Sequence, residues 1–211
     1  MNEQGQLPSA PAAERNFEPI LGVLRREFTN ATRVLEIGAG TGQHAAGFAA
    51  EMPWLNWLPT DRAENISGIA EWQRAAGLSN LECPRVLNVA RDAPPEGPFD
   101  AAFSANTAHI MDEAAVRKMF EIVGGLLVQH GRFCLYGPFC EDGRFSTASN
   151  ERFDASLREA DPSMGIRHLD TIDENAGGVG LRRIRRFAMP GNNLTLVFEQ
   201  RAGTARKHDE S

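Results

Sequence analysis

The sequence lacks any long hydrophobic run: no apolar stretch approaches the roughly 20 residues that a membrane-spanning helix requires. The first fifteen residues are polar and rich in proline and alanine, without the basic and then apolar pattern of a signal peptide. Both absences predict a protein with no membrane partner.

Cysteine is scarce as well. The three cysteines, Cys83, Cys134 and Cys140, are odd in number and form no Cys-x-x-Cys pair. We therefore expect neither a disulfide framework nor a zinc site, and we predict no metal cofactor. A reducing cytoplasm is the simplest location for such a chain.

An excess of positive charge is also missing. The 28 acidic and 22 basic residues give a formal net charge of −6. Proteins that bind DNA or RNA usually carry a basic surface, so this balance argues against a nucleic-acid partner. With 211 residues, of which 42 % are apolar, the chain has the size of one α/β domain with a sizeable core.

Hydrophobic periodicity predicts alternating helices and strands along most of the chain. Phe17, Ile20, Leu24 and Phe28 recur at helical spacing, with Pro19 expected in the first turn of that helix. Strands are predicted over 33–37, 55–60, 85–89, 99–104 and 132–136, with helices between them. The segment 137–148 is interpreted as a loop, followed by a short helix that Ser149 would cap and a weaker helix over 171–176. Two strands, 182–189 and 194–200, close the chain as a hairpin.

This order predicts an α/β fold: a mostly parallel sheet with helices on both faces and a C-terminal antiparallel hairpin. The domain is expected to span residues 15–200. Residues 1–14 are interpreted as a flexible arm, and the charged residues 201–211 as a disordered tail.

The strongest local signal is the glycine-rich stretch after the first strand, Gly38-Ala39-Gly40-Thr41-Gly42. Glycines allow a sharp turn and close approach of a ligand, and the following helix presents free N–H groups. Asp61 ends the second strand, where an acid can accept hydrogen bonds from both hydroxyls of a ribose. Three readings remain open: a dinucleotide site, an S-adenosylmethionine (SAM) site, and a purely structural turn.

The spacing of the glycines separates the two cofactors. In the dinucleotide pattern G-x-G-x-x-G, the third glycine would fall on Gln43. The G-x-G-x-G spacing, with Glu36 two residues before Gly38, instead resembles the first motif of class I SAM-dependent methyltransferases. We therefore expect SAM as the cofactor.

Further stretches extend this resemblance over about residues 8–200. They are 9–16 (SAPAAERN), 106–110 (NTAHI), 136–139 (YGPF), 149–150 (SN) and 189–193 (MPGNN). Together they resemble a methyltransferase-like family catalogued mostly as a domain of unknown function. The resemblance implies a Rossmann-like, seven-stranded SAM-binding sheet.

The resemblance also implies residue roles. Glu36, Gly38 and Gly40 would surround the methionine part of SAM, Asp61 would hold the ribose, and Arg62 would flank the adenine. Asn88 stands where an acid normally bonds the adenine amino group; its amide oxygen can accept that bond, but without charge. The full set of expected cofactor residues is Arg15, Asn16, Glu36, Gly38, Ala39, Gly40, Asp61, Arg62, Asn88, Val89, Ser104 and Asn106.

Two residues are candidates for catalysis. His109 follows the fourth strand and would serve as a general base, or else pack beneath the cofactor. Tyr136 ends the fifth strand, where its hydroxyl would face the acceptor, or it is an ordinary strand aromatic. Asn106 would bond a ligand or cap its turn, while Arg15 and Asn16 would close over the SAM carboxylate or stay solvated.

The sequence thus predicts a SAM-dependent methyltransferase for a small-molecule N, O or S acceptor. The stretch 104–107 lacks the prolines and stacking aromatic with which base-flipping amino-methyltransferases hold a base, which again disfavours nucleic acid. The alternative is a SAM-binding sensor or scaffold without catalysis. The oligomeric state stays open.

Overall fold

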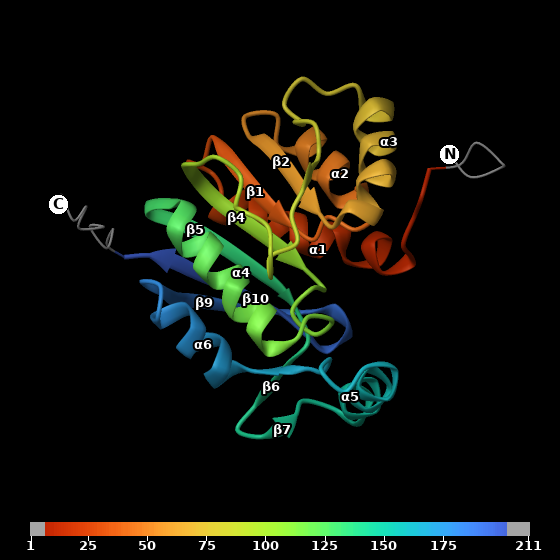
Figure 1. Ribbon diagram of the computed structural model, residues 1–211, viewed down its shortest axis with the longest axis vertical. Helices are drawn as coiled ribbons and strands as arrows, with labels where there is room; N and C mark the ends of the chain where they lie inside the picture. Colours follow the sequence, from red (N-terminus) through yellow and green to blue (C-terminus); the bar gives the residue numbers. More distant parts are fainter. Residues whose placement is uncertain (1–6, 202–211) are drawn as a thin grey trace.

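One sheet of seven strands organises the molecule (Figure 1). The computed structural model describes residues 7–201. In spatial order the strands are β3 (Arg85–Val86), β2 (Asn56–Asp61), β1 (Arg33–Ile37), β4 (Phe99–Ala105), β5 (Leu127–Gly137), β10 (Asn193–Gln200) and β9 (Leu181–Met189).

The strand directions confirm the predicted sheet. β3, β2, β1, β4 and β5 pair in parallel, whereas β10 runs antiparallel to both β5 and β9. The C-terminal hairpin therefore inserts a single antiparallel strand into an otherwise parallel sheet. Because parallel strands end at the same edge, the loops after β1, β2, β4 and β5 meet there.

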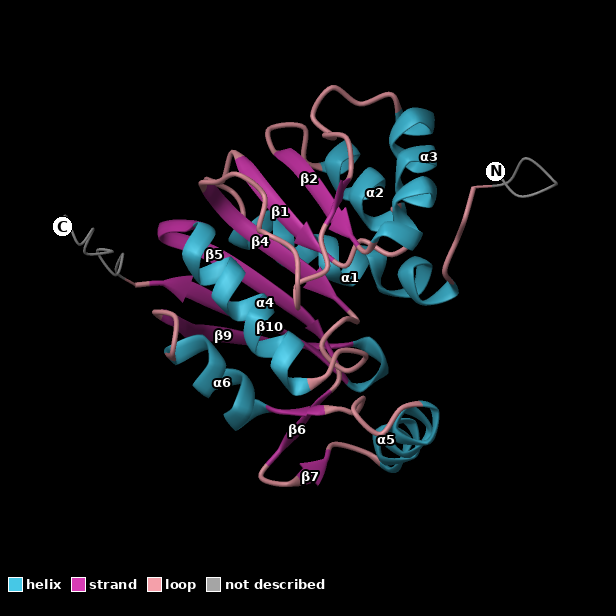
Figure 2. Ribbon diagram, in the orientation of Figure 1, coloured by secondary structure: helices cyan, strands magenta, loops and turns pink. Residues whose placement is uncertain are grey.

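Helices cover both faces of this sheet (Figure 2). α1 (Pro11–Glu27), α2 (Gln43–Glu51) and α3 (Ile66–Ala76) pack on one face, in a core that includes Leu24, Phe48 and Trp57. α4 (Glu113–Leu126) and α6 (Leu169–Gly177) pack on the other face, around Phe120 and Phe133. Asp112 caps the N-terminus of α4, because its carboxylate accepts the Ala115 N–H at 2.7 Å.

The first helix begins earlier than the periodicity indicated. α1 starts at Pro11, so Pro11 takes the first-turn position that the sequence analysis gave to Pro19, and Pro19 lies inside the helix. Residues 11–14, expected in a loose arm, are helical. The preceding residues are held as well: the Trp72 indole N–H donates to the Pro8 carbonyl at 2.6 Å, and the Ala10 N–H donates to the Gln43 side chain at 3.2 Å. Residues 1–6 of the expected arm and 202–211 of the expected tail lie outside the described residues.

The segment 137–148 is not a plain loop, and that prediction is wrong. It contains β6 (Phe139–Glu141) and β7 (Arg144–Phe145), which form a second sheet with β8 (Arg167–His168). The turn between β6 and β7 is Asp142-Gly143, both with positive φ (51° and 70°). An Asp-Gly pair favours this hairpin turn, but the flanking strands are too short for periodicity to detect.

Other boundaries also differ from the prediction. α5 (Ala148–Ala160) is capped by Thr147, whose hydroxyl accepts the Asn150 N–H, rather than by Ser149. β3 ends at Val86 instead of continuing to residue 89, while β5 begins at Leu127. The 3-10 turns η1 (Ala63–Asn65) and η2 (Pro190–Asn192) complete the described elements. Between residues 7 and 201, no helix has the length and apolar character to cross a membrane.

Candidate cofactor and acceptor site

The glycine-rich loop joins β1 to α2, and its three glycines have different neighbours. All three have positive φ: 77° at Gly38, 60° at Gly40 and 89° at Gly42. A Cβ on Gly38 would lie 2.3 Å from the Cγ2 atom of Thr107, and one on Gly42 would lie 2.7 Å from the Cα atom of Ile69. A Cβ on Gly40 would meet nothing within 4 Å. The outer glycines therefore allow the chain to pack on itself, whereas Gly40 borders open space.

Asp61 is joined directly to this loop. Its carboxylate accepts the backbone N–H of Gly40 at 2.6 Å, and it also accepts the N–H of Arg62 at 2.7 Å and the amide N–H of Asn65 at 2.9 Å. A carboxylate has about four acceptor positions, so the three bonds leave it able to accept from a further hydroxyl. The Arg62 side chain extends outward, 57 % exposed, to an ion pair with Glu64.

Glu36 lies beneath the loop and is almost fully buried. Its carboxyl group accepts the indole N–H of Trp57 at 2.7 Å. Burial is the main cause that raises the pKa of Glu36 to about 8; the Trp57 hydrogen bond opposes this rise, and repulsion from Asp61 adds to it. A cation placed nearby would favour the ionised form of this group.

Asn88 follows the end of β3 and is engaged in its own turn. Its side-chain oxygen accepts the Ala90 N–H at 3.1 Å, and its backbone N–H donates to the Asp92 carboxylate at 2.6 Å. Val89 beside it is buried. The turn thus brings an acid, Asp92, next to the position where the sequence lacks one. Asp92 was not singled out from the sequence, where its only signal is its place four residues after Asn88.

Two of the expected cofactor residues lie near the end of β4, one in the strand and one just after it. The Ser104 hydroxyl is fully buried; it donates to the Ile37 carbonyl at 2.7 Å and lies 2.6 Å from the Thr107 hydroxyl. The Ser104 side chain therefore supports the start of the glycine-rich loop from the buried side. Asn106 has a positive φ of 58°, and its backbone N–H donates to the Tyr136 carbonyl at 2.9 Å.

A buried polar cluster forms where α1 crosses the ends of β5 and β10. Hydrogen bonds link the Tyr136 hydroxyl to the side chains of Asn16 and Asn193, and the positive charge of Arg15 acts on it. Burial is the main cause that raises the pKa of Tyr136, so this phenol stays protonated at neutral pH. The cluster brings together three residues that the sequence suggested separately: Arg15, Asn16 and Tyr136.

His44 belongs to the same cluster and was missed from the sequence. Its Nε2 atom lies 2.8 Å from Oδ1 of Asn16 and 3.2 Å from the carbonyl oxygen of Ala13. Both partners are acceptors, so this nitrogen carries the proton. Burial lowers the pKa of His44 to about 4, which keeps the ring neutral. His44 carries no sequence signal of its own beyond lying near the glycine-rich loop. Asn193 belongs to the stretch 189–193 that carries the family resemblance, but the sequence assigned it no role.

His109 lies between β4 and α4, at the edge of the sheet where the parallel strands end. Its ring packs edge-on against Phe153 of α5, with centroids 5.3 Å apart, and its side chain is buried. Burial, and next the charge of Arg167, lower the pKa of His109 to about 4. The imidazole is therefore neutral at physiological pH and able to accept a proton, although with low basicity.

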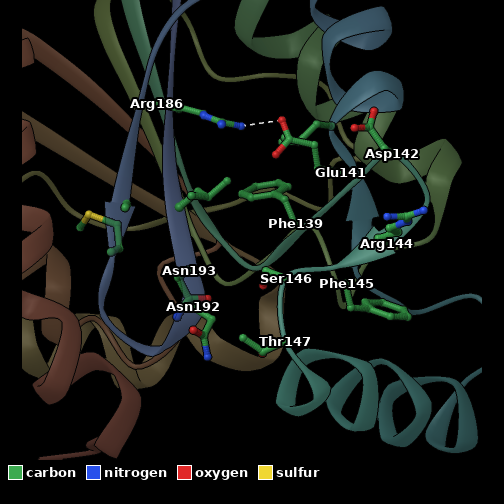
Figure 3. A pocket seen from close by; sticks show the side chains of 14 residues that line it. Phe139, Glu141, Asp142, Arg144, Phe145, Ser146, Thr147, Arg186, Asn192 and Asn193 are labelled. Atoms are coloured by element: carbon green, nitrogen blue, oxygen red, sulfur yellow. Dashed lines mark hydrogen bonds and ion pairs between the residues drawn. The ribbon is translucent and has the colours of Figure 1, made fainter.

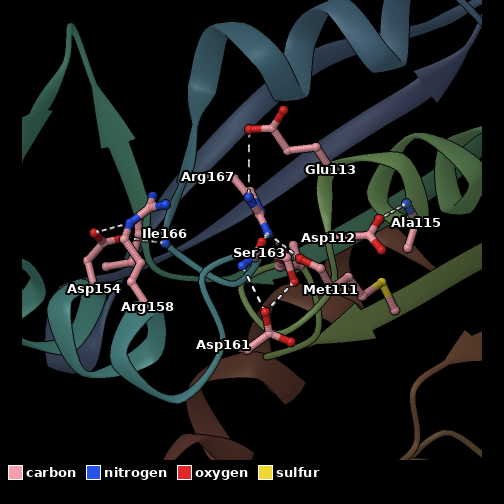
Figure 4. A network of polar contacts seen from close by, with 11 residues as sticks. Met111, Asp112, Glu113, Ala115, Asp154, Arg158, Asp161, Ser163, Ile166 and Arg167 are labelled. Atoms are coloured by element: carbon pink, nitrogen blue, oxygen red, sulfur yellow. Dashed lines mark hydrogen bonds and ion pairs between the residues drawn. The ribbon is translucent and has the colours of Figure 1, made fainter.

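Arg167 fixes the loop that carries His109 (Figure 4). Its guanidinium donates to the carbonyl oxygens of Ala108 at 3.0 Å, Ser163 at 2.8 Å and Met111. Because Arg167 is buried, this arrangement is a rigid support for the loop rather than a surface contact. Within residues 7–201, no group of three His, Cys, Asp or Glu side chains is arranged to hold a metal ion.

The structure thus places the expected residues in three groups around the edge where the parallel strands end. The first group lies at the ends of β1 and β2 and consists of Glu36, Gly38, Ala39, Gly40, Asp61 and Arg62. The second group follows β3 and consists of Asn88 and Val89. The third group lies on α1 and around the ends of β4 and β5, and consists of Arg15, Asn16, Ser104, Asn106, His109 and Tyr136.

Comparisons with known proteins agree with this fold. A family model described as "Protein of unknown function (DUF938)" matches residues 7–200. Among solved structures, an O-methyltransferase family protein from Burkholderia thailandensis matches with a TM-score of 0.76 at 17 % identity, covering 91 % of this chain and 58 % of that one.

Two further structures match in the same way. Human N-acetylserotonin methyltransferase in complex with SAM gives a TM-score of 0.71 at 13 % identity, covering 90 % of this chain and 53 % of that one. Mitomycin 7-O-methyltransferase gives a TM-score of 0.70 at 18 % identity, with 92 % and 59 % coverage. At these identities the matches establish a methyltransferase-like fold, and the chain spans less than two thirds of the length of these structures.

Proposed function

The chain belongs to the family described as "Protein of unknown function (DUF938)", and from this premise and the geometry above we propose that it is a SAM-dependent methyltransferase for small-molecule N, O or S acceptors. The observation that carries the proposal is the pairing of Gly40 with Asp61. Gly40 borders open space, and an acid at the end of the neighbouring strand is bonded to its N–H at 2.6 Å. This is the chemistry that a ribose beside a close-approaching ligand requires.

The residues present fit SAM. Gly38, Ala39 and Gly40 would face its methionine part above Glu36, whose ionisation would complement the net positive charge of the cofactor. Asp61 would accept from a ribose hydroxyl, with Arg62 beside the adenine. At the adenine amino group, Asn88 would act together with Asp92, because the oxygen of Asn88 already accepts a backbone N–H.

When bound, SAM supplies a methyl group activated by its sulfonium charge, which an acceptor N, O or S attacks in line as the thioether leaves. The chain mainly has to bring the acceptor to that methyl and hold it there. Tyr136, held by Asn16 and Asn193, would donate a hydrogen bond to the acceptor. His109, neutral and fixed by the Arg167-supported loop, would take the proton that an O–H or N–H acceptor releases.

A second candidate function is a SAM-binding module without catalysis. It is favoured by the low basicity of His109, whose pKa of about 4 makes it a weak base at neutral pH. A thiolate acceptor, in contrast, would need no base.

Binding and turnover separate the possibilities. Calorimetry with SAM, S-adenosylhomocysteine and NAD is expected to show the first two binding and NAD not binding; NAD binding without SAM binding would overturn the cofactor assignment. Mass spectrometry of ligands that co-purify with the chain is expected to reveal SAM or S-adenosylhomocysteine. If SAM binds but no methyl transfer occurs with any acceptor pool, the non-catalytic alternative holds.

The acceptor class requires its own assay. Tritiated methyl transfer is run in parallel on a small-molecule extract, total RNA, sheared DNA and denatured protein, at a SAM concentration below saturation, with the weakly SAM-binding Asp61→Ala variant as the low-activity control. Label chiefly in the small-molecule fraction is the expected result, because the net charge of −6 disfavours polyanions. Label chiefly in a macromolecular fraction would contradict the small-acceptor proposal.

A further inference from the structure

A cavity of about 910 Å³ lies between the β6–β7 hairpin and the β9–β10 hairpin (Figure 3). Its size falls within the range of small-molecule sites. The β6–β7 hairpin lies outside the main sheet and contributes none of the residues expected to hold the cofactor. The cavity therefore has no role in the site as described so far.

One end of the cavity adjoins the polar cluster. Asn193, at the start of β10, lines the cavity and also hydrogen-bonds with the Tyr136 hydroxyl. Phe139, which forms a cavity wall, follows Tyr136 by only three residues. A molecule in the cavity would thus have one end beside Asn193 and close to the phenol that is proposed to orient the acceptor.

The inner wall of the cavity is apolar on one side. The ring of Phe139 points into the space in Figure 3, opposite the β9–β10 hairpin. Phe139, Leu169 and Met189 are buried, and Leu194 lies among them. These side chains give this part of the wall an apolar character, against which a ring can pack.

The polar groups inside the cavity are uncharged. Ser146, Thr147, Asn192 and Asn193 supply hydroxyl and amide groups, which can donate to or accept from a neutral ligand. They gather where the α5 N-terminus meets the hairpin turn, and Asn150 ties the two together by donating to the Asn192 carbonyl at 3.2 Å.

The charged side chains at the mouth are two acids and two arginines. Glu141 and Asp142 stand against Arg144 and Arg186, and Arg186 donates to Glu141 across the mouth at 2.6 Å (Figure 3). An anion would have to compete with Glu141 for Arg186, and a cation would have to compete with Arg186 for Glu141. A charged ligand therefore gains no free counter-charge at this pair, whose side chains are about half exposed to water, whereas an uncharged ligand does not need one.

We propose that this cavity binds the methyl acceptor, and that the acceptor is an uncharged, ring-containing molecule with hydroxyl or amide groups at the end that meets Asn193. The proposal rests on the proposed methyltransferase function for its link to methyl transfer. Binding in the cavity is measurable without SAM, so the two ideas can fail separately.

The test uses three phenols that share one ring and differ in charge at neutral pH: tyrosol (neutral), tyramine (cation) and para-hydroxyphenylacetate (anion). Binding is followed by NMR of protein labelled at the methionine methyl groups. Met189 lines the cavity, whereas Met52 and Met119 are buried elsewhere and serve as internal references. Tyrosol is expected to shift the Met189 signal and to bind at least about tenfold more tightly than either charged phenol.

A matched pair of variants locates the binding. Ala188 is exposed and lines the cavity, so Ala188→Phe fills the space without entering the core; it is expected to weaken tyrosol binding by about tenfold or more. Ala75→Phe makes the same change at an exposed position on α3 and should leave binding unchanged. Circular dichroism and thermal melting confirm that both variants fold.

Each remaining outcome overturns the proposal. Charged phenols that bind as tightly as tyrosol would refute the uncharged class, and an unaffected Ala188→Phe variant would refute the location. Absence of any Met189 shift at about millimolar phenol would refute the cavity as a ring-binding site. Failure of SAM to bind in calorimetry would instead refute the proposed function and leave the cavity result standing.

Discussion

The Asp61 carboxylate accepts the backbone N–H of Gly40 at 2.6 Å, so the end of β2 is tied to the loop that follows β1. The two residues are 21 positions apart in the sequence, and the parallel pairing of β1 with β2 brings them together. The same carboxylate also holds the first turn after β2 through Arg62 and Asn65. One side chain thus shapes both loops that are proposed to hold the cofactor.

We predict that Asp61→Ala weakens SAM binding by about 1.5–3 kcal/mol, the usual scale for losing hydrogen bonds to a charged group. Calorimetry measures the change. Asp61→Asn is the matched control: it keeps an acceptor for the Gly40 N–H but removes the charge, so its affinity should lie between those of the parent and Asp61→Ala. Parent-like SAM affinity in Asp61→Ala would show that Asp61 does not hold the ribose.

A second prediction compares two glycines of the loop. Gly40→Ala places its Cβ in open space, so the expected stability cost is only about 1–2 kcal/mol for the positive φ, while SAM affinity falls sharply because the methyl blocks close approach. Gly38→Ala places its Cβ 2.3 Å from Thr107, so it should destabilise the fold even without ligand. Thermal melting and calorimetry on both variants separate the effects. A Gly40→Ala protein that binds SAM normally would show that no ligand approaches this residue.

We expect His109→Ala and Tyr136→Phe to leave SAM affinity nearly intact. If His109 is the general base for an O–H or N–H acceptor, His109→Ala lowers methyl transfer by about 10²–10⁴-fold. Since the pKa of His109 is about 4, the rate of the parent should not fall through protonation of this residue until the solution is acidic. Steady-state rates over a pH series, with SAM affinity measured beside them, test both points. Unchanged turnover in both variants would reduce the two residues to structural roles.

Glu36 supplies a prediction about stability at alkaline pH. Its pKa is raised from 4.5 to about 8 in the folded protein, so the folded state binds the extra proton and the stability that this provides is lost as pH rises between those values. Glu36→Gln stays neutral and keeps an acceptor for the Trp57 indole. At pH 8 we expect it to be more stable than the parent by on the order of 3 kcal/mol, with little difference near pH 4.5. Urea unfolding at both pH values measures this. A variant that is less stable than the parent at pH 8 would contradict the buried, protonated state.

His44 has the opposite dependence on pH. Its pKa falls from 6.5 to about 4 on folding, so its neutral form is favoured in the folded state and stability is lost as pH decreases through this window. His44→Gln, which keeps a donor to Asn16, should flatten the loss of unfolding free energy between neutral pH and about pH 4, by on the order of 3 kcal/mol. His168→Gln, at an exposed position, is the control and should leave the pH dependence as in the parent. Identical acid profiles for the parent and His44→Gln would show that this buried ring is not the cause.

Local sequence patterns determined the main sheet and the glycine-rich turn. The alternation of apolar segments predicted the parallel sheet and its closing hairpin, and the glycine-rich stretch after β1 predicted the turn at Gly38 and Gly40. These features are encoded within short windows, because strand and helix periods and the glycine requirement at positive φ depend on neighbouring residues. The placement of Asp61 beside the loop followed from the parallel order of the first two strands.

Only the tertiary structure decided which side chains meet at the edge of the sheet where the parallel strands end. Asn16, His44, Tyr136 and Asn193 come from four separate elements, and nothing in the spacing of their positions predicts that they form one cluster. The short strands β6 and β7, and with them the cavity against β9 and β10, are formed by pairings too brief to leave a periodic pattern. The pKa values of Glu36 and His109 depend on burial, which is a property of all the elements packed around a side chain. Long-range packing sets these features, so the sequence by itself names the residues but not their neighbours or their charge states.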